Sequence, residues 1–184
     1  STVLVTGLGG IGISIVQGAR IAGAEKIIVS DPVAERREAA LHFGATHTID
    51  PFNDELLPKV LEETGNIGVD YAFEAAGVAA LVDDCVNASR TGGSTIIVGV
   101  DATLATVPIL PVMMATMGKK IIGSLLGDCH PQRDIPRFIS LWKSGKLDLD
   151  GMIRHRVALN DINLGFENVR QTKGIRTVVE VATT

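Results

Sequence analysis

The clearest candidates for chemistry in this 184-residue chain are the glycines of a turn near its N-terminus. The run Gly7-Leu8-Gly9-Gly10-Ile11-Gly12 has the spacing G-x-G-x-x-G and follows the β-branched apolar residues 2–6. Asp31 comes nineteen residues after the last of these glycines. A loop of this kind between a strand and a helix holds the pyrophosphate of a dinucleotide, and the acid accepts hydrogen bonds from a ribose diol. We therefore expect a dinucleotide site, and the alternative is a glycine-rich turn in another α/β fold.

The three motif glycines have separate physical roles in this prediction. Gly7 allows a tight turn at the end of the strand, Gly9 lets a pyrophosphate approach the backbone, and Gly12 lets the helix pack closely on the strand. The helix N-terminus that follows offers unpaired N–H groups and the positive end of a dipole to the phosphates.

Two arginines follow Asp31 closely, and one of them is in place to cover the adenosine or to neutralise a 2′-phosphate. The Asp31 carboxylate disfavours a phosphate there, because two anions would meet at the ribose edge. NAD is therefore expected over NADP. Arg36 is the candidate for the ribose, whereas a solvated helix face is expected for Arg37.

Four further positions allow two interpretations each. The backbone of Gly99, at the end of an apolar strand, either faces a nicotinamide ring or simply turns the chain. Arg176 either pairs with a surface acid or binds phosphate. For Glu74 a structural or capping role is favoured over a general base, because no partner is identifiable. Cys129-His130 is expected to be an ordinary loop rather than a nucleophile and its base, since such pairs usually meet across a fold.

Composition excludes several classes of function. The net charge is −4 and the basic residues form no stripe, so no nucleic acid is expected as a partner. The uncharged residues 1–19 contain the glycine motif, and residues 102–118 contain Pro108 and Pro111, so neither a signal peptide nor a membrane span is expected. Two cysteines without close spacing predict no disulfide framework and no metal site, and they fit a cytoplasmic protein.

Strands and helices alternate along residues 1–127, which predicts a doubly wound parallel α/β sheet, the Rossmann fold. The expected strands cover residues 2–6, 26–30, 46–49, 69–73, 95–100 and 120–125, and the expected helices cover residues 10–22, 33–43, 54–64 and 78–88. The proline- and methionine-rich residues 108–117 are expected to pack or to form an interface. Residues 128–184, with helices expected near 135–145 and 161–171 and strands near 153–159 and 176–181, are predicted to be a tail that belongs to a second domain.

As an ordered set, several motifs resemble the zinc-dependent alcohol dehydrogenases of the medium-chain dehydrogenase/reductase superfamily. They are G-L-G-G-I-G at Gly7 to Gly12, the strand ending in Asp31, Phe43-Gly44-Ala45-Thr46, Val69-Asp70-Tyr71-Ala72-Phe73-Glu74, Ile97-Val98-Gly99-Val100, Gly123-Ser124-Leu125-Leu126-Gly127-Asp128 and Gly174-Ile175-Arg176-Thr177-Val178. The resemblance extends from one end of the chain to the other.

The resemblance implies a role for each candidate residue. The glycine loop and Arg176 would bind the pyrophosphate, and Asp31 with Arg36 would bind the adenosine ribose. The backbone of Val98, Gly99 and Val100 would line the nicotinamide pocket. The edge strand from Lys120 to Leu125 would pair subunits into a homo-oligomer. The implied reaction is hydride transfer between a small alcohol or aldehyde and NAD, assisted by zinc.

One departure limits what this chain is expected to do alone. In the family the zinc ligands and proton-relay residues lie in a domain that precedes the cofactor domain, and this chain begins at the first strand of the cofactor fingerprint. We therefore expect the cofactor-binding part of such an enzyme, inactive by itself, with its catalytic and zinc-binding residues outside this chain. A stand-alone NAD-binding or sensing module is the alternative, and a zinc-free quinone reductase relative also stays open. A short-chain dehydrogenase is excluded, because Tyr71, the one tyrosine, is followed four residues later by Ala75.

Overall fold

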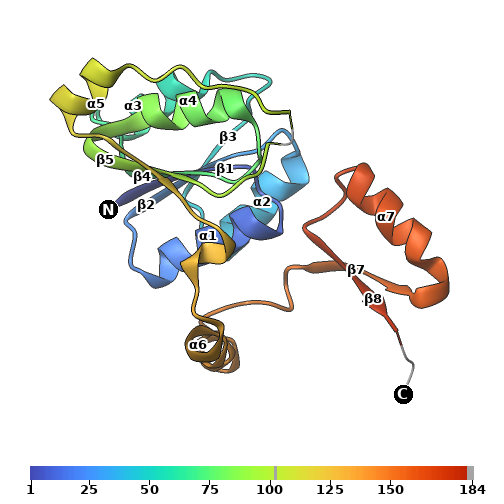
Figure 1. Ribbon diagram of the computed structural model, residues 1–184. Coiled ribbons are helices and arrows are strands. Elements are labelled where there is room, and N and C mark those ends of the chain that lie inside the picture. The colour runs from blue at the N-terminus through green and yellow to red at the C-terminus, as the bar shows by residue number, and fades with distance from the viewer. Residues whose placement is uncertain (102, 182–184) are drawn as a thin grey trace.

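A six-stranded parallel sheet forms the centre of the molecule, shown in Figure 1 as a computed structural model that describes residues 1–101 and 103–181. The strand order is β3-β2-β1-β4-β5-β6. The strands are β1 (Thr2–Thr6), β2 (Lys26–Ser30), β3 (His47–Ile49), β4 (Val69–Glu74), β5 (Ser89–Ile97) and β6 (Lys120–Gly123). The order reverses between β1 and β4, and ligands of open α/β sheets bind at the carboxyl ends of the strands at such a point. The predicted doubly wound parallel fold is confirmed.

Helices cover both faces of this sheet (Figure 1). One face carries α1 (Gly10–Ile21) and α2 (Ala34–Phe43), and the other carries α3 (Leu56–Glu63) and α4 (Ala79–Ala88). Alternate residues of β1 enter two separate cores: Val3 and Val5 pack with α1 and α2, whereas Leu4 packs with residues of α3 and α4. A strand buried on both faces needs a continuous apolar run, which explains the unbroken apolar stretches in the middle of β1 and β2.

The predicted bounds of β5 are wrong, because the strand begins at Ser89 and ends at Ile97 rather than covering residues 95–100. Its first residues are polar or glycine, so an apolar run could not reveal them. They pair with β4 through a register shift between Val69 and Tyr71. Residues 98–100 consequently lie beyond the strand, and β6 likewise ends at Gly123, two residues earlier than expected.

Asp70 joins the starts of three strands. Its carboxylate accepts hydrogen bonds from the Thr2 backbone N–H (2.7 Å) and hydroxyl (3.2 Å) and from Nε of Arg90 (2.6 Å). The Thr2 backbone N–H, followed by Arg90, holds the pKa of Asp70 below its ordinary value. The unfolded chain therefore binds more protons than the folded chain at acid pH. The stabilisation is present above about pH 4 and is lost as the pH falls through the folded-state pKa.

Replacing Asp70 with asparagine is expected to lower the free energy of unfolding by about 1–2 kcal/mol at pH 7, because a charged acceptor shared by three donors is lost. The variant should also lose part of the acid sensitivity that the wild type shows as the pH falls below about 4. Urea unfolding at a series of pH values measures both effects. The exposed carboxylate Asp161, changed to asparagine, is the control, and equal pH slopes for wild type and Asp70→Asn would contradict the prediction.

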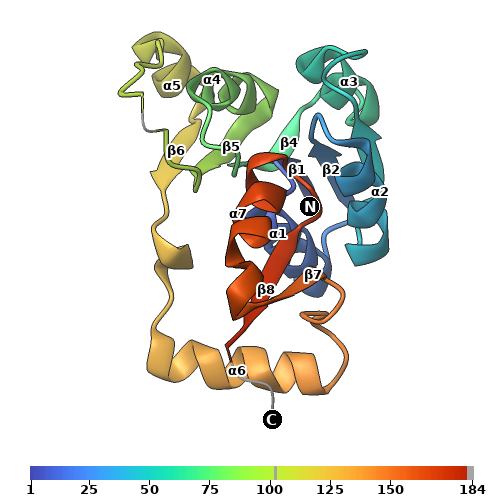
Figure 2. The same ribbon diagram turned by 90° about the vertical axis from the view of Figure 1, so that its right-hand side faces the viewer.

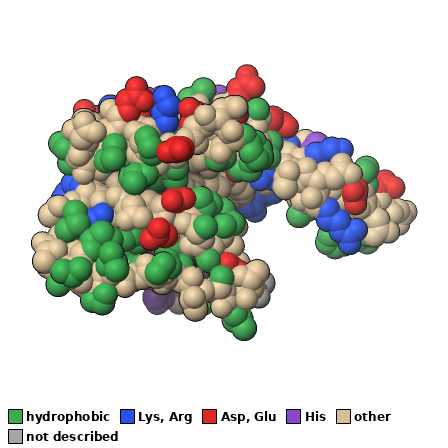
Figure 3. All heavy atoms as spheres, turned by 90° about the horizontal axis from the view of Figure 1, so that it is seen from above, with side chains coloured by type: hydrophobic (Ala, Val, Ile, Leu, Met, Phe, Trp, Pro, Cys, Tyr) green, Lys and Arg blue, Asp and Glu red, His purple; other side chains and the backbone are tan. Residues whose placement is uncertain are grey.

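Residues 108–117, between β5 and β6, form no strand but include the short helix α5 (Pro111–Met117), whose Val112 is exposed. After β6 the C-terminal third of the chain leaves the main sheet. The remaining elements are the 3-10 turns η1 (Leu126–Asp128) and η2 (Leu159–Asp161), the helices α6 (Pro131–Lys143) and α7 (Ile162–Arg170), and the strands β7 (Ile153–Ala158) and β8 (Arg176–Glu180). Strands β7 and β8 form a separate parallel pair. Together with α7 they lie to one side of the main body in Figures 1 and 3, and in front of it in Figure 2.

The connection between α6 and β7 lies along α1. The fully buried side chain of Gln17 donates from Nε2 to the Asp148 carbonyl (3.0 Å) and accepts the Asp148 backbone N–H (2.7 Å). Arg20 donates to the Lys146 carbonyl (2.8 Å), and Met152 is buried in the core with α1 and α2. The chain therefore departs from the body formed by the six-stranded sheet and its helices only after Met152. Among the described residues, no helix is long and apolar enough to cross a bilayer.

Candidate functional site

The glycine loop follows β1 at the carboxyl edge of the sheet. Gly7 has φ +87°, and a Cβ on it would lie 2.8 Å from the Ala76 nitrogen. A Cβ on Gly12 would lie only 1.8 Å from the Gly7 carbonyl oxygen. A Cβ on Gly9 would meet no atom within 4 Å. The outer glycines are therefore required for packing, whereas the absent side chain of Gly9 leaves the loop surface open.

Helix α1 begins at this loop without a side-chain cap and without an acid in its first turn. The N–H of Ile13 closes the first turn on the Gly9 carbonyl (3.0 Å). Helix N-termini carry unpaired N–H groups and a partial positive charge, so this end of α1 can accept an anion. A cavity of about 520 Å³ opens beside it. The residues that line this cavity include Gly7, Leu8, Gly9, Ser30, Asp31, Val33, Arg36, Pro51, Ala75, Ala76 and Thr172.

Asp31, at the end of β2, lines the cavity and is almost completely buried. One carboxylate oxygen accepts the N–H of Leu8 (2.7 Å) and the other accepts the N–H of Val33 (2.8 Å). The acid thus connects the glycine loop to the start of α2. A carboxylate has about four lone-pair positions, so two are left for hydroxyl groups of a ligand in the cavity.

Two cations predicted from the sequence lie beside this loop. Nη1 of Arg36 lies 3.9 Å from an Asp31 carboxylate oxygen, and Nε donates to the Gly174 carbonyl (3.0 Å). Nη2 of Arg176 lies 2.9 Å from the position of a Cβ on Gly10, at the start of α1. No carboxylate within the described residues pairs with Arg176. The guanidinium of Arg176 therefore lies at the helix end where an anion is favoured.

Val98, Gly99 and Val100 lie after β5, and the N–H groups of Val98 and Gly99 both donate to the Glu74 carbonyl (2.9 Å each). A Cβ on Gly99 would lie 2.2 Å from the Gly77 nitrogen, so close packing already requires a glycine there. Gly99 borders a smaller cavity of about 130 Å³, and both cavities are lined by Val78. Val100 is 82 % exposed.

The Glu74 side chain has the capping role expected of it. Its Oε1 accepts the N–H groups of Ala76 and Gly77 (2.8 Å each) and of Val78 (3.3 Å). The carboxylate therefore fixes the turn between β4 and α4, opposite the glycine loop.

The prediction of a solvated Arg37 is wrong. Its guanidinium donates to the Asp31 carbonyl (2.6 Å) and to the Asp50 carboxylate (2.7 Å), and the side chain is only 14 % exposed. The missed signal was Asp50 at the end of the third predicted strand, since parallel strands bring their carboxyl ends together. Arg37 thus joins β2 to the loop after β3.

Sequence reasoning also missed other residues that line the cavity. Pro51, Ala75 and Ala76 follow the carboxyl ends of β3 and β4, where the strand order would have placed them. Thr172 belongs to the turn before β8, and nothing local in its sequence points to the glycine loop.

The two cysteines differ in burial. Burial raises the pKa of the Cys85 thiol to about 12, whereas Cys129 is partly exposed. Because the thiolate is the reactive form, we expect a thiol reagent at pH 8 to modify one cysteine per folded chain and two in denaturant. Peptide mapping should identify Cys129 as the modified residue. Rapid modification of Cys85 in the folded chain would contradict its burial.

The described residues contain no group of three or more His, Cys, Asp or Glu side chains able to hold a metal ion.

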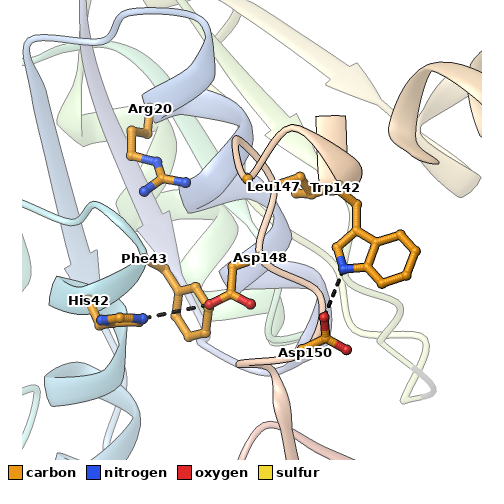
Figure 4. Close-up of a pocket in the computed structure, with 8 residues that line it drawn as sticks. Arg20, His42, Phe43, Trp142, Leu147, Asp148 and Asp150 are labelled. Carbon is orange, nitrogen blue, oxygen red and sulfur yellow. Dashed lines mark hydrogen bonds and ion pairs between the residues drawn. The ribbon is translucent and has the colours of Figure 1, made fainter. Parts of the chain in front are cut away.

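A third cavity, of about 340 Å³, lies between α1, α2 and the connection after α6 (Figure 4). His42 pairs with Asp148 across it (3.6 Å), and Nε1 of Trp142 donates to Asp150 (2.8 Å). It adjoins the C-terminal ends of α1 and α2, and therefore the opposite edge of the sheet from the glycine loop. Ligands of open parallel sheets bind at the carboxyl edge, so the cavity beside the glycine loop is the candidate site.

Known proteins resemble this chain along nearly its whole length. The NDMA-dependent alcohol dehydrogenase of Amycolatopsis methanolica is 39% identical over 181 residues, which are 97% of this chain and 48% of that protein. The crystal structure of benzyl alcohol dehydrogenase from Acinetobacter calcoaceticus has a TM-score of 0.94 at 27% identity, covering 99% of this chain and 50% of the other. A structure from Sinorhizobium meliloti described as a zinc-binding dehydrogenase bound to NADP has a TM-score of 0.89 at 30% identity, covering 98% and 52%.

The chain therefore spans about half the length of the curated relatives it matches. The zinc-binding dehydrogenase family matches residues 10–144, which are more than half of the chain. Together with the parallel Rossmann-type sheet, this match confirms the expected family: the chain belongs to the zinc-binding dehydrogenases of the medium-chain dehydrogenase/reductase superfamily.

Proposed function

We propose that this chain is the NAD-binding part of an alcohol dehydrogenase that moves hydride between a small alcohol or aldehyde and NAD. One observation carries the proposal: the open glycine loop, the uncapped start of α1, Asp31 and Arg176 converge on one side of the sheet. These groups fit a dinucleotide, because a cation and helix dipole suit the pyrophosphate and a buried carboxylate suits a ribose diol.

Each predicted residue then has a role. The loop from Gly7 to Gly12 and the guanidinium of Arg176 bind the pyrophosphate. Asp31 accepts the hydroxyl groups of the adenosine ribose, with Arg36 beside it. The backbone from Val98 to Val100 borders the nicotinamide. When bound, NAD supplies the hydride acceptor and zinc polarises the alcohol oxygen, and we assign the zinc ligands to the part of the longer protein outside this chain.

Calorimetric titration of the 184-residue chain with NADH and with NADPH tests the proposal. NADH is expected to bind and NADPH to bind at least about tenfold more weakly, because a 2′-phosphate would meet the Asp31 carboxylate. A folded chain that binds neither nucleotide would overturn the proposal. Tighter binding of NADPH would overturn the choice of NAD alone.

The same chain is expected to turn over no alcohol by itself. Its relatives are about twice as long, which favours a partial enzyme over the alternative of a stand-alone sensing module. Oxidation of a simple alcohol by the purified chain, monitored as NADH absorbance, would contradict this expectation. We further propose residues 1–127 as the nucleotide-binding domain and residues 128–184 as the tail that belongs in part to a second domain.

We also propose that the chain forms a homo-oligomer through the edge strand from Lys120 to Leu125. Strand β6 is the last strand of the sheet, and the side chains of Ile122 and Leu125 are exposed. Hydrophobic side chains gather over the neighbouring helix α5 (Figure 3). An unpaired edge beside an apolar surface favours strand pairing with a second copy.

The two free cysteines are consistent with a cytoplasmic protein.

A further inference from the structure

We propose that Arg36 is a positioning residue that holds Arg176 at the start of α1. Arg36 does so through the carbonyl of Gly174, two residues before Arg176 in the chain. The inference rests on the proposed function, because it concerns how the pyrophosphate cation is placed. It adds to the place beside the ribose proposed for Arg36, because a contact with the ribose alone would need no part of the C-terminal turn.

The first step is the geometry of the turn. Thr172 and Gly174 both have positive φ values, +53° and +65°, so the chain reverses direction here just before β8. A Cβ on Gly174 would lie 2.7 Å from the Arg154 side chain, so one side of the turn packs on β7. Its other side presents the Gly174 carbonyl to Arg36, which donates from Nε at 3.0 Å. The turn is therefore held between β7 and the nucleotide-binding body.

The second step is the small number of contacts that join residues 153–181 to the body of the six-stranded sheet. Among the hydrogen bonds of the described residues, the bond from Arg36 to Gly174 is the one that joins residues 153–181 to residues 1–101. Ile175 adds apolar contact with the core below the loop. The unit of β7, α7 and β8 otherwise projects from the body (Figure 3). Loss of the Arg36 bond therefore removes the hydrogen bond that fixes the turn before Arg176 to this body.

The third step is the difference in how the two arginines are paired. Nε of Arg36 donates to the Gly174 carbonyl, its Nη1 lies 3.9 Å from Asp31, and the side chain is only 17 % exposed. The Arg176 guanidinium, by contrast, lies beside Gly10 with no paired carboxylate within the described part of the chain. Arg176 is thus the cation available to bind a phosphate, and Arg36 determines its position.

A double-mutant cycle tests this assignment on the 184-residue chain. NADH affinity is measured for wild type, Arg36→Met, Arg176→Met and the double variant. We expect Arg36→Met and Arg176→Met each to weaken binding about tenfold, and the loss in the double variant to be clearly smaller than the product of the two single losses. Two losses that multiply to about a hundredfold would mean that the two arginines act independently and would overturn the inference.

Hydrogen exchange of the amides of residues 172–177, without nucleotide, supplies a readout independent of binding. Arg36→Met should speed their exchange. Arg20→Met is the matched control, because Arg20 makes the same kind of bond to the Lys146 carbonyl away from the turn, and it should leave these amides unchanged. Unchanged exchange in Arg36→Met would overturn the inference whatever the nucleotide affinities are. A wild-type chain that binds no NADH would overturn the proposed function and, with it, the role given to Arg176.

Discussion

Gly9→Ala is expected to weaken NADH binding by about a hundredfold or more while leaving the chain folded. An alanine methyl at this position meets no protein atom within 4 Å, and the backbone of Gly9 is extended, with φ −72° and ψ −166°. The free energy of unfolding should therefore fall by no more than about 1 kcal/mol, the range for a changed N-cap. The methyl instead occupies the surface that a pyrophosphate must approach.

Gly12→Ala, in contrast, is expected to lower the free energy of unfolding strongly. Its methyl would lie 1.8 Å from the Gly7 carbonyl oxygen, so the loop and α1 must separate, at a cost of about 3 kcal/mol in stability. Gly18→Ala is the control, because Gly18 is an exposed residue of α1 with no atom near its Cβ position, and it should gain about 0.5–1 kcal/mol. Urea unfolding and NADH titration of the three variants separate the effects. An unfolded Gly9→Ala, or full NADH affinity in that variant, would contradict the assignment of this loop.

Asp31→Asn is the second large effect expected. The amide keeps one oxygen acceptor for the Leu8 N–H, loses the acceptor of the Val33 N–H, and removes the charge that opposes a 2′-phosphate. NADH binding should weaken about tenfold, and the preference for NADH over NADPH should shrink by a similar factor. Calorimetric titration with both nucleotides measures the change. A ratio of affinities equal to that of the wild type would show that Asp31 does not select the nucleotide.

The usual truncation, Asp31→Ala, is a poorer test, because Asp31 also has a structural role. It would leave the N–H of Leu8, a completely buried residue, without its acceptor. Such a loss costs about 1–3 kcal/mol, so weaker binding could result from a displaced glycine loop. The asparagine variant keeps the acceptor for Leu8, and its unfolding free energy, measured in parallel, accounts for the lost bond to Val33.

The outline of the sheet could be predicted from the sequence because its signals are local. β1 and β2 have the predicted bounds, since each is a short apolar run ending in a turn. Gly44 ends α2 with φ +119°, as a C-terminal glycine should. The start of β5 was missed because its polar residues join the sheet by pairing with β4. The sequence of one strand does not show which strand it pairs with.

The glycine loop, the acid after β2 and the family could be predicted before the fold was known, because residue type and spacing encode backbone conformation and the order of elements. The partners of the charged side chains became clear in the folded molecule alone. Arg37 pairs with Asp50 rather than with water, and Arg36 bonds to Gly174, 138 residues away in sequence. A long flexible cation can reach many acceptors near its own position. Which acceptor it meets depends on the packing that brings distant segments together, and local sequence patterns do not record that packing.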